Sequence, residues 1–345
     1  SLVSALGSDL HQAATRLADG STPLSRITLP GGTQWPFFPI ETAQTSWRQR
    51  ARTLLQGAID QAGVGARRDL PLFIASSSLQ MGAIEAGEVT LEEDYLGFAD
   101  EIATWLGWQG PLHLISTACT SSLHALLAAA AHLRSGTAAD AVILGVELAN
   151  RYTLAGFAAM QLLSPDAARP LGAERNGLVL GEAVAALHLS TTPSRWRLRG
   201  GSCLVDGRDP TGARTETVVQ LCRQALADSG LSAEQIDLVK VQASGSPAND
   251  LNEVAGLREA FGTLPPLVSL KGVIGHTLGA SGAAELALLL ECLERGLWPP
   301  VDYPLDPAAG GGLALGRPAQ VRQLLALILG FGGGYAAVAL EDCHG

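Results

Sequence analysis

Short apolar runs alternate with longer helical patterns along this 345-residue chain, most clearly between residues 112 and 147. The apolar run from Leu112 to Ile115 ends in small residues and Cys119. An Ala- and Leu-rich stretch then continues to about Arg134 and is closed by Gly136, which predicts a buried helix. The pattern therefore places Cys119 on a turn between a strand and a helix.

The same signals predict the other elements of the first half. A helix follows the turn at Gly7, with Ser8 or Asp9 as its cap, and stops at Gly20. A second helical pattern covers residues 46–63. Three further continuous apolar runs have the length of strands buried on both faces: 70–75, 141–145 and 183–189.

The second half of the chain repeats the order of the first. The helix ending at Gly63 and the strand after it have counterparts in a helix over 221–230 and an apolar run over 237–244. The Cys119 turn is matched by a turn at His276, followed by an apolar helix to Arg295. This repeat predicts two similar halves, 1–192 and 193–345. Because the connections are long and helical, we expect parallel strands covered by helices on both sides.

Composition excludes several functional classes. A net charge of −10 and the absence of a basic stripe argue against a nucleic-acid partner. No uninterrupted apolar run reaches the roughly 18 residues of a membrane span. The five cysteines lack disulfide-like spacing, so a reducing, cytoplasmic location is expected. The seven histidines lack metal-ligand spacing, so we expect no metal and no cofactor.

Cys119 is the first candidate for chemistry. Unpaired N–H groups and the helix dipole at a helix N-terminus both favour the thiolate, which is the nucleophilic form of cysteine. On local sequence alone, the alternative is a small buried hydrophobic residue among alanines. The surrounding sequence, STACTS, resembles the active-site segment of the chain-elongating β-ketoacyl-ACP synthases. That resemblance implies that Cys119 accepts the acyl group.

The resemblance extends from about Ser4 to Leu340 and implies a thiolase-like α/β fold. In that fold, two similar βαβ halves form a five-layered αβαβα structure with the active site between them. A second motif, SLKGVIGHTLGASGAAE over 269–285, has Lys271, His276 and Glu285 at the family's catalytic spacing. The alternative for His276 is a structural core histidine.

A third motif, LGFGGGYAAVAL over 329–340, resembles the C-terminal strand of the synthases. Phe331 matches the gating phenylalanine whose backbone N–H, with that of Cys119, forms the oxyanion hole. Tyr335 and Gly334 replace the family's usual asparagine and threonine.

The fourth motif departs from the family. Residues 241–253 read VQASGSPANDLNE and keep the proline, asparagine, aspartate and glutamate of the pattern, but the first catalytic histidine is missing. Depending on where the gap is placed, Gln242 or Ser244 takes its position. Losing one such hydrogen-bond donor typically costs about 10²- to 10³-fold in rate. Acyl transfer to Cys119 is expected to suffer less than condensation.

The resemblance implies acyl transfer from acyl carrier protein to Cys119, then decarboxylative condensation with malonyl carrier protein in fatty acid or polyketide biosynthesis. One alternative is a non-elongating acyl-transferring homologue, or a divergent synthase that needs a complete partner subunit. Another is a non-catalytic partner that shapes the acyl tunnel, although such partners usually lack the cysteine. Thiolases fit less well, because they need a second catalytic cysteine near the C-terminus and Cys343 lies in the wrong context for it. Chain-initiating synthases fit less well, because they have an asparagine loop where this chain has GHTLGASG.

The expected partners are the carrier protein and a second synthase subunit, identical or different. In the family, the strand before the cysteine pairs across a two-fold axis, and 112–115 is too apolar for an open edge. Carrier docking would use a local basic patch, for which the candidates are Arg48, Arg50, Arg52, Arg67 and Arg68.

Three further expectations concern individual segments. The strand that precedes the first helix in the family is missing or cut short here. The region from Met81 to Trp108 is shorter than in the family, and residues 88–94 within it are expected to form a solvated loop. His124, on the helix after Cys119, is expected to be a structural hydrogen-bonding residue.

Overall fold

Two five-stranded sheets form the framework of the computed structural model, which describes residues 1–20, 23–44, 46–90 and 95–344. The first sheet has the order β1-β8-β6-β4-β5. Its strands are β1 (Leu2–Ser4), β4 (Leu72–Ala75), β5 (Leu112–Ile115), β6 (Asp140–Glu147) and β8 (Ala183–Ser190). The second sheet has the order β11-β10-β12-β13-β9. Its strands are β9 (Trp196–Val205), β10 (Leu238–Lys240), β11 (Leu267–Val268), β12 (Gln323–Gly330) and β13 (Gly334–Asp342).

The two sheets have the same topology. When strands are matched in chain order, β1, β4, β5, β6 and β8 occupy the same sheet positions as β9, β10, β11, β12 and β13. The internal repeat expected from the sequence is therefore present in three dimensions. We propose that the halves 1–192 and 193–345 are the two structural units of the chain.

The expectation of parallel strands is only partly right. β4 pairs in parallel with β5 and β6, but β8 runs antiparallel to both β6 and β1. The second sheet shows the same mixture, with β13 antiparallel to β12 and β9. An apolar run predicts a buried strand but not the direction in which the strand runs. The direction depends on the end of the sheet at which the chain enters it again.

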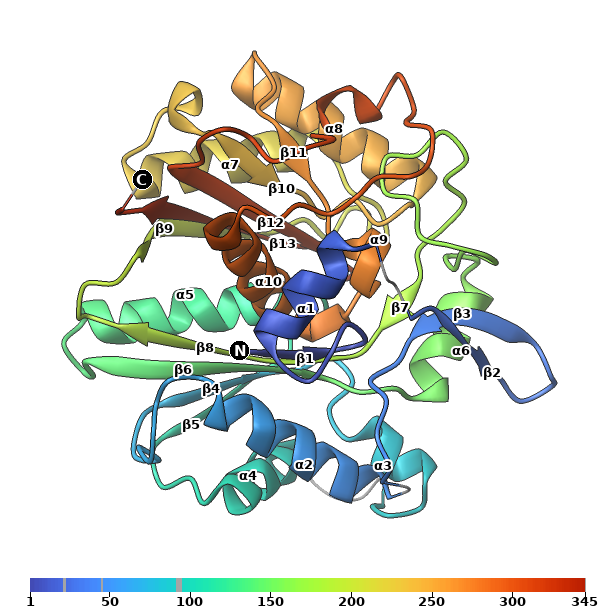
Figure 1. The fold of residues 1–345 in the computed structure, drawn as a ribbon, viewed down its shortest axis with the longest axis vertical. Coiled ribbons are helices and arrows are strands. Elements are labelled where there is room, and N and C mark those ends of the chain that lie inside the picture. Colours follow the sequence, from blue (N-terminus) through green and yellow to red (C-terminus); the bar gives the residue numbers. More distant parts are fainter. Residues whose placement is uncertain (21–22, 45, 91–94, 345) are drawn as a thin grey trace.

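Helices complete five layers, α-β-α-β-α (Figure 1). α2 (Trp47–Asp60) and α4 (Tyr95–Leu106) cover the outer face of the first sheet. α5 (Ser121–Arg134) and α10 (Ser281–Arg295) lie between the sheets, and α1 (Leu10–Ala18) packs on α10. α7 (Thr215–Ser229) and α8 (Pro247–Phe261) lie outside the second sheet.

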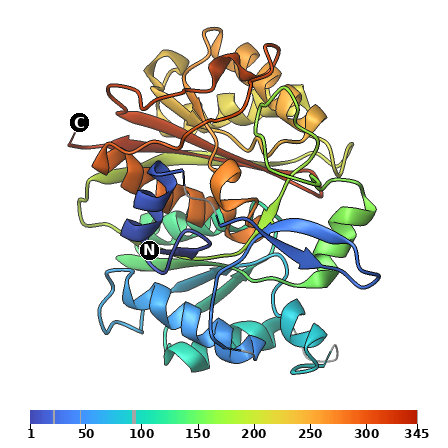
Figure 2. The ribbon, with the colours of Figure 1, turned by 45° about the vertical axis from the view of Figure 1, so that its right-hand side comes forward.

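The remaining elements lie near the ends of the sheets. The helices are α3 (Met81–Glu85), α6 (Arg151–Ala159) and α9 (Lys271–Ile274). The strands β2 (Ser25–Thr28), β3 (Gln34–Phe38) and β7 (Leu180–Gly181) form a small sheet. Figures 1 and 2 both show the β2–β3 hairpin projecting at one side of the molecule.

Small residues allow the central layer to pack closely. A Cβ atom added at Gly282 of α10 would lie 2.9 Å from the side chain of Leu123 on α5. The near-continuous Ala and Leu pattern of α5 and α10 therefore buries both helices between the sheets. Cys119 and His276 lie just before these two helices and are thereby brought to the same region.

The chain starts and ends its helices largely where the sequence indicates. Asp9, rather than Ser8, caps α1, since its Oδ1 accepts the N–H of Gln12 at 2.7 Å. α10 ends at Gly296, which adopts a left-handed conformation. The strand expected to be missing or cut short before α1 is present as the three-residue β1, which pairs with β8.

Glu88 corrects the expectation of a solvated loop over 88–94. Its carboxylate accepts hydrogen bonds from Ser46 Oγ (2.9 Å) and from the N–H groups of Trp47 (2.8 Å) and Arg48 (3.0 Å), so it caps α2. An acidic side chain is stabilised there by the free N–H groups and the helix dipole. Residues 91–94 of the same expectation lie outside the described residues.

Four of the five arginines expected to offer a basic patch are paired with carboxylates, and the exception is the exposed Arg52. Arg50 is partly buried and makes two hydrogen bonds to Glu182, at 2.7 and 2.6 Å. Three others pair with carboxylates: Arg48 with Glu101, Arg67 with Asp140, and Arg68 with Asp60. Spacing along the sequence identified the arginines, but their partners come from other elements.

Candidate functional site

Cys119 lies on the turn between β5 and α5, as its sequence context predicts. The turn is tight: Ala118 has φ of +51°, and the hydroxyl groups of Thr120 and Ser121 bond back to the carbonyls of Thr117 and Ala118 at 2.6 Å. Cys119 itself is 4% exposed. On the same helix, His124 Nδ1 contacts Thr117 Oγ1 and the carbonyl of Thr120, in keeping with the structural role expected for it.

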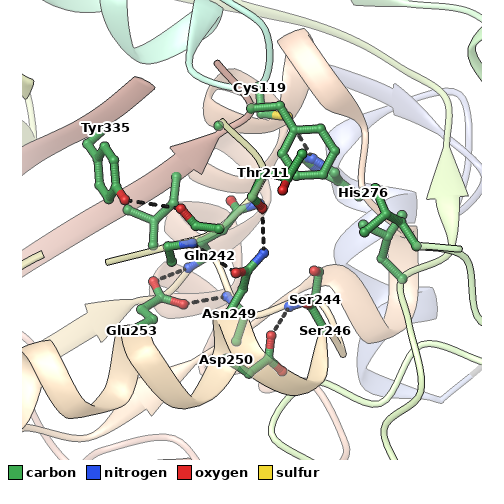
Figure 3. A pocket seen from close by; sticks show the side chains of 18 of the residues that line it. Cys119, Thr211, Gln242, Ser244, Ser246, Asn249, Asp250, Glu253, His276 and Tyr335 are labelled. Carbon is green, nitrogen blue, oxygen red and sulfur yellow. Dashed lines mark hydrogen bonds between the residues drawn. The ribbon is translucent and has the colours of Figure 1, made fainter. Parts of the chain in front are cut away.

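His276 is the direct partner of Cys119. Its Nε2 lies 3.0 Å from the Sγ atom of Cys119 (Figure 3). Its Nδ1 lies 3.0 Å from Ser281 Oγ. The preceding Gly275 has φ of +70°, and a Cβ there would lie 2.7 Å from the ring of Phe38, so this turn requires glycine. The structure thus joins a residue from each half of the chain in one hydrogen-bonded pair.

Burial keeps the Cys119–His276 pair uncharged. It raises the pKa of Cys119 to about 11, while the backbone N–H groups of Phe331 and Cys119 act in the opposite direction. It also lowers the pKa of His276 to about 3, assisted by the positive charge of Lys271. A neutral imidazole has one unprotonated ring nitrogen that can accept the thiol proton, as a general base for a nucleophile requires.

Two backbone N–H groups act on the Cys119 thiol. The N–H groups of Phe331 and Cys119 both lower the pKa of the Cys119 thiol, as the donors of an oxyanion hole would. Phe331 lies in the turn between β12 and β13, and its ring stacks on that of Phe157 from α6, with centroids 5.3 Å apart. Gly333 permits this turn, since a Cβ there would lie 1.9 Å from the carbonyl oxygen of Asp206.

Lys271 and Glu285 form a buried ion pair behind His276. Glu285 Oε1 contacts Lys271 Nζ, and Glu285 Oε2 lies 2.9 Å from the Nζ atom of a second lysine, Lys240. All three side chains are at most 1% exposed. Sequence reasoning missed Lys240, although a lysine inside the apolar run Leu238–Val241 is the signal that could have found it.

The segment that lacks the family's first histidine lies in the same cavity. Cys119, His276, Gln242 and Ser244 all line it (Figure 3). The Oε1 atom of Gln242 is buried without a hydrogen-bond partner. Both residues considered for the histidine's position therefore reach the cavity with a polar side chain.

Two carboxylates of α8 hold the backbone of this segment. Glu253 accepts the N–H groups of Gln242 (2.6 Å) and Ala243 (2.8 Å). Asp250 accepts those of Ser244 and Gly245, both at 3.1 Å. Because these are the aspartate and glutamate that the fourth motif retains, the backbone support of the motif is intact although its histidine is absent.

A loop over residues 206–214 forms another wall of the cavity. Asn249 accepts the N–H of Ala213 at 2.8 Å and donates to the carbonyl of Thr211 at 3.1 Å. The hydroxyl of Tyr335 accepts the N–H of Arg214 at 2.8 Å, and Asn252 donates to the carbonyl of Ala213 at 2.9 Å. The tyrosine that replaces the family's asparagine thus anchors this loop.

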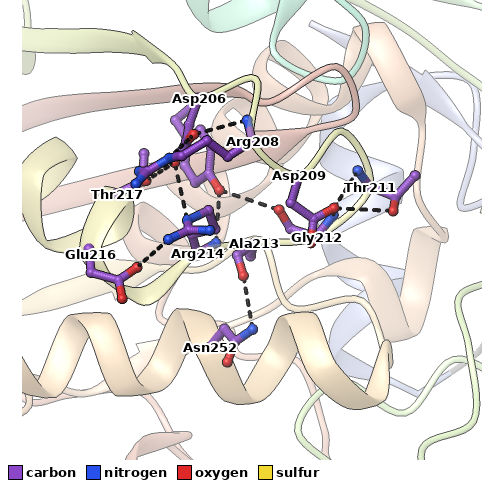
Figure 4. Close-up of polar contacts among 11 residues, drawn as sticks. Asp206, Arg208, Asp209, Thr211, Gly212, Ala213, Arg214, Glu216, Thr217 and Asn252 are labelled. Carbon is purple, nitrogen blue, oxygen red and sulfur yellow. Dashed lines mark hydrogen bonds and ion pairs between the residues drawn. The ribbon is translucent and has the colours of Figure 1, made fainter.

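Charged side chains tie the same loop to α7. Asp206 pairs with Arg208 and Arg214 and accepts the hydroxyl hydrogen of Thr217 at 2.5 Å (Figure 4). The Asp206–Arg214 pair thus joins the two ends of the loop, and Asn249 holds Thr211 and Ala213 between them. Neither arginine was expected to contribute to the site from its sequence context.

Within the described ranges, no group of three or more His, Cys, Asp or Glu side chains is placed to hold a metal ion. Among the helices described there, none combines the length and apolarity needed to cross a membrane.

The structure resembles solved ketosynthases. A chain of the ketosynthase–chain length factor complex from Xenorhabdus doucetiae has a TM-score of 0.86 at 24% identity, covering 99% of this chain and 96% of that one. A β-ketoacyl synthase from Burkholderia phymatum has a TM-score of 0.83 at 22% identity, covering 99% and 98%. The fold is therefore the thiolase-like fold expected from the sequence.

Curated relatives carry related names. A chloroplastic 3-oxoacyl-[acyl-carrier-protein] synthase II from Arabidopsis thaliana is 34% identical over 220 residues, which are 56% of this chain and 40% of the relative. Nodulation protein E from Rhizobium meliloti is 28% identical over 262 residues, 71% of this chain and 65% of the relative. The chain thus spans about 40% to 65% of the length of these two relatives.

Two family models match successive parts of the chain. The model described as β-ketoacyl synthase, N-terminal domain, matches residues 62–194. The model described as β-ketoacyl synthase, C-terminal domain, matches residues 198–302. Together the two matches cover well over half of the sequence, and they include Cys119, Lys271, His276 and Glu285. The chain therefore belongs to the β-ketoacyl synthase family.

Proposed function

We propose that this protein is an acyltransferase that takes an acyl group from acyl carrier protein onto Cys119. The observation that carries the proposal is the 3.0 Å contact between Cys119 Sγ and His276 Nε2. The sulfur attacks the thioester carbonyl, His276 takes the thiol proton, and the carrier thiol leaves with a proton. The N–H groups of Cys119 and Phe331 bind the oxygen that becomes negative in between.

We further propose that the acyl enzyme undergoes decarboxylative condensation with malonyl carrier protein. Loss of CO2 from the malonyl group leaves an enolate whose carbon attacks the acyl carbonyl. The carbon–carbon bond forms as the bond to Cys119 breaks, giving a β-ketoacyl carrier protein and returning the sulfur. His276 and a neutral donor from Gln242 or Ser244 stabilise the enolate oxygen, while Lys271 and Glu285 support His276.

A second candidate function is acyl transfer without elongation, or elongation only with a partner subunit. It is favoured by one observation: the position of the first histidine is filled by Gln242 or Ser244, which supply no imidazole. A third candidate is a non-catalytic partner comparable to the chain length factor in the Xenorhabdus doucetiae complex. The retained Cys119–His276 pair weighs against that role.

The names of the relatives support both fatty acid and polyketide biosynthesis as settings. They include the chloroplastic synthase and erythronolide synthase EryA2 from Saccharopolyspora erythraea, which is 31% identical over 273 residues, 70% of this chain and 8% of that protein. A neighbouring structure contains an acyl carrier protein in complex with its ketosynthase, which supports a carrier protein as the partner here.

Intact-protein mass spectrometry tests the proposal. The wild type is incubated with acyl carrier protein thioesters, with and without malonyl carrier protein, beside Cys119→Ala. We expect the wild type alone to gain the acyl mass and then to lose it as β-ketoacyl carrier protein forms. An acyl group that loads and stays would identify a transfer or partner-dependent form. Absence of loading would reject Cys119 as the nucleophile.

Gln242→Leu and Ser244→Ala identify the donor that replaces the histidine. Loss of that donor is expected to slow release of the loaded acyl group by about 10²-fold or more while loading continues. If neither variant affects condensation, a donor at this position is not used.

A further inference from the structure

Lys240 is a buried cation that none of the motifs includes. It is the last residue of β10 and is 1% exposed, and its Nζ atom lies 2.9 Å from Glu285 Oε2. The other oxygen of the same carboxylate is bound by Lys271. One carboxylate therefore has two ammonium partners, one from β10 and one from α9.

Two ammonium groups and one carboxylate leave this cluster with an excess positive charge. An excess positive charge taken out of water is costly unless another group of opposite sign lies near. The candidate is Glu253 of α8, which is also 1% exposed. Glu253 lies close to the end of β10, since it binds the N–H of Gln242, two residues after Lys240, at 2.6 Å. Burial lowers the pKa of Lys240 to about 8 and raises that of Glu253 to about 7, and the charge of each residue opposes the shift of the other. With Glu253 ionised, two ammonium groups face two carboxylates.

The ionised form of Glu253 matters for the cavity. Its two oxygens accept the N–H groups of Gln242 and Ala243 separately, at 2.6 and 2.8 Å. A protonated carboxyl group carries its hydrogen on one of these oxygens and loses acceptor capacity there. Burial and the neighbouring Asp250 both raise the pKa of Glu253, so its ionisation depends on nearby positive charge.

We propose that Lys240 is a positioning residue: it pairs with Glu285, supplies positive charge to the nearby Glu253, and thereby holds Gln242 in the cavity that it shares with Cys119 and His276. The proposal rests on the function proposed above, because its effect is on condensation. Lys240 connects the part of the site built on α9 and α10 to the part built on β10 and α8. It thus supports the segment from which the histidine is missing.

The test compares Lys240→Met, Glu253→Gln and the double variant by the two-stage mass assay. In Lys240→Met, the carboxylate of Glu285 keeps Lys271 as its buried partner. We expect each single variant to condense about tenfold more slowly and to lose less in its loading rate, because Gln242 is needed for condensation and not for loading. The double variant should be no slower than either single variant, because both act on the same contact.

The pH dependence separates positioning from a general structural role. Without Lys240, the pKa of Glu253 rises, so the condensation rate of Lys240→Met should recover towards the wild-type rate as pH increases. Glu253→Gln, which has no charge to regain, should not recover. Lys240→Arg retains the positive charge and should condense faster than Lys240→Met. Additive losses in the double variant, or a Lys240→Met profile parallel to that of the wild type, would overturn the proposal.

Urea unfolding at pH 8 provides a readout that does not depend on activity. The free energies of unfolding of the four proteins form a double-mutant cycle, and we expect the two substitutions to be clearly non-additive. Additive free energies would reject the Lys240–Glu253 link even if wild-type condensation is observed. Non-additive free energies in a protein that never loads an acyl group would instead reject the proposed function and retain the link. If Lys240→Met does not fold, Lys240→Arg and Glu253→Gln complete the comparison.

Discussion

At the scale of residues, the central feature is that Cys119 and His276 are both kept neutral by burial. An ion pair between thiolate and imidazolium would need two charges in a site with little water, and the positive charge of Lys271 disfavours a second cation nearby. Proton transfer is therefore coupled to the attack of the sulfur, when the two N–H groups can stabilise the new negative oxygen. The resting site is an uncharged pair rather than a preformed thiolate.

The neutral state of His276 predicts a specific loss of stability in acid. Its pKa is about 3 in the folded protein, against about 6.5 for an unfolded histidine. Between these values the unfolded state binds more protons, so stability falls as pH decreases, by up to about 1.4 kcal/mol per pH unit. His276→Gln should lose this contribution.

Urea unfolding of both proteins between pH 8 and pH 4 measures the effect. Asp250, whose pKa burial raises to about 6, has the opposite dependence between about pH 4 and 6, but it is present in both proteins and cancels in the difference. A difference between the two curves that does not change with pH would contradict a neutral His276.

At the scale of elements, the site depends on how closely α7 and α8 approach. Gly256 of α8 makes this contact: a Cβ there would lie 2.6 Å from the Cβ of Val218 and 2.8 Å from the carbonyl oxygen of Thr215. The N-terminal half of the same helix provides Asn249, which supports the loop, and Glu253, which supports Gln242. The position of α8 thus connects helix packing to the shape of the cavity.

Gly256→Ala should destabilise the protein, although alanine is the better helix former. Separating the two helices costs about 1–3 kcal/mol, more than the gain of about 1 kcal/mol in helix propensity. Gly57→Ala in α2 is the matched control, because a Cβ there meets no atom within 4 Å, and it should stabilise by about 1 kcal/mol. Thermal and urea unfolding measure both changes. Equal effects of the two substitutions would show that α7 and α8 can separate freely.

At the scale of the whole molecule, β5 is the last strand of the first sheet. The carbonyls of Pro111 and Ile115 accept hydrogen bonds from β4, at 2.8 and 3.3 Å. Because alternate residues of a strand direct their backbone groups to opposite sides, Leu112 and Leu114 direct theirs to the open edge. We propose that a second subunit, identical or different, pairs with this edge.

A proline at the edge tests this assembly. Leu114→Pro removes an N–H that points away from β4, so the subunit should fold while association with a partner weakens by at least tenfold. Mass photometry across a concentration series measures the change, with Val205→Lys as a surface control in the other sheet, where the side chain is 80% exposed. A wild type that stays monomeric at all concentrations would contradict the proposed dimer.

Local patterns in the sequence identified the elements and most of the candidate residues. The turns at Cys119 and His276 were predictable because small residues interrupt an apolar run and a buried helix follows, and both effects act over neighbouring residues. The same local patterns, which recur in the same order in both halves, identified the internal repeat. The family's motifs added Lys271, Glu285 and Phe331, which lie on short segments of fixed spacing.

Tertiary structure alone decided which distant groups meet. Four of the five arginines expected to form a patch are paired with carboxylates from other elements. Lys240 binds the carboxylate of Glu285, which lies 45 positions further along the chain. Strand direction in the mixed sheets also escaped prediction, because an apolar run has the same composition in either direction. Amino-acid pattern encodes burial and local conformation, whereas charge pairing depends on distances through space that only the folded chain establishes.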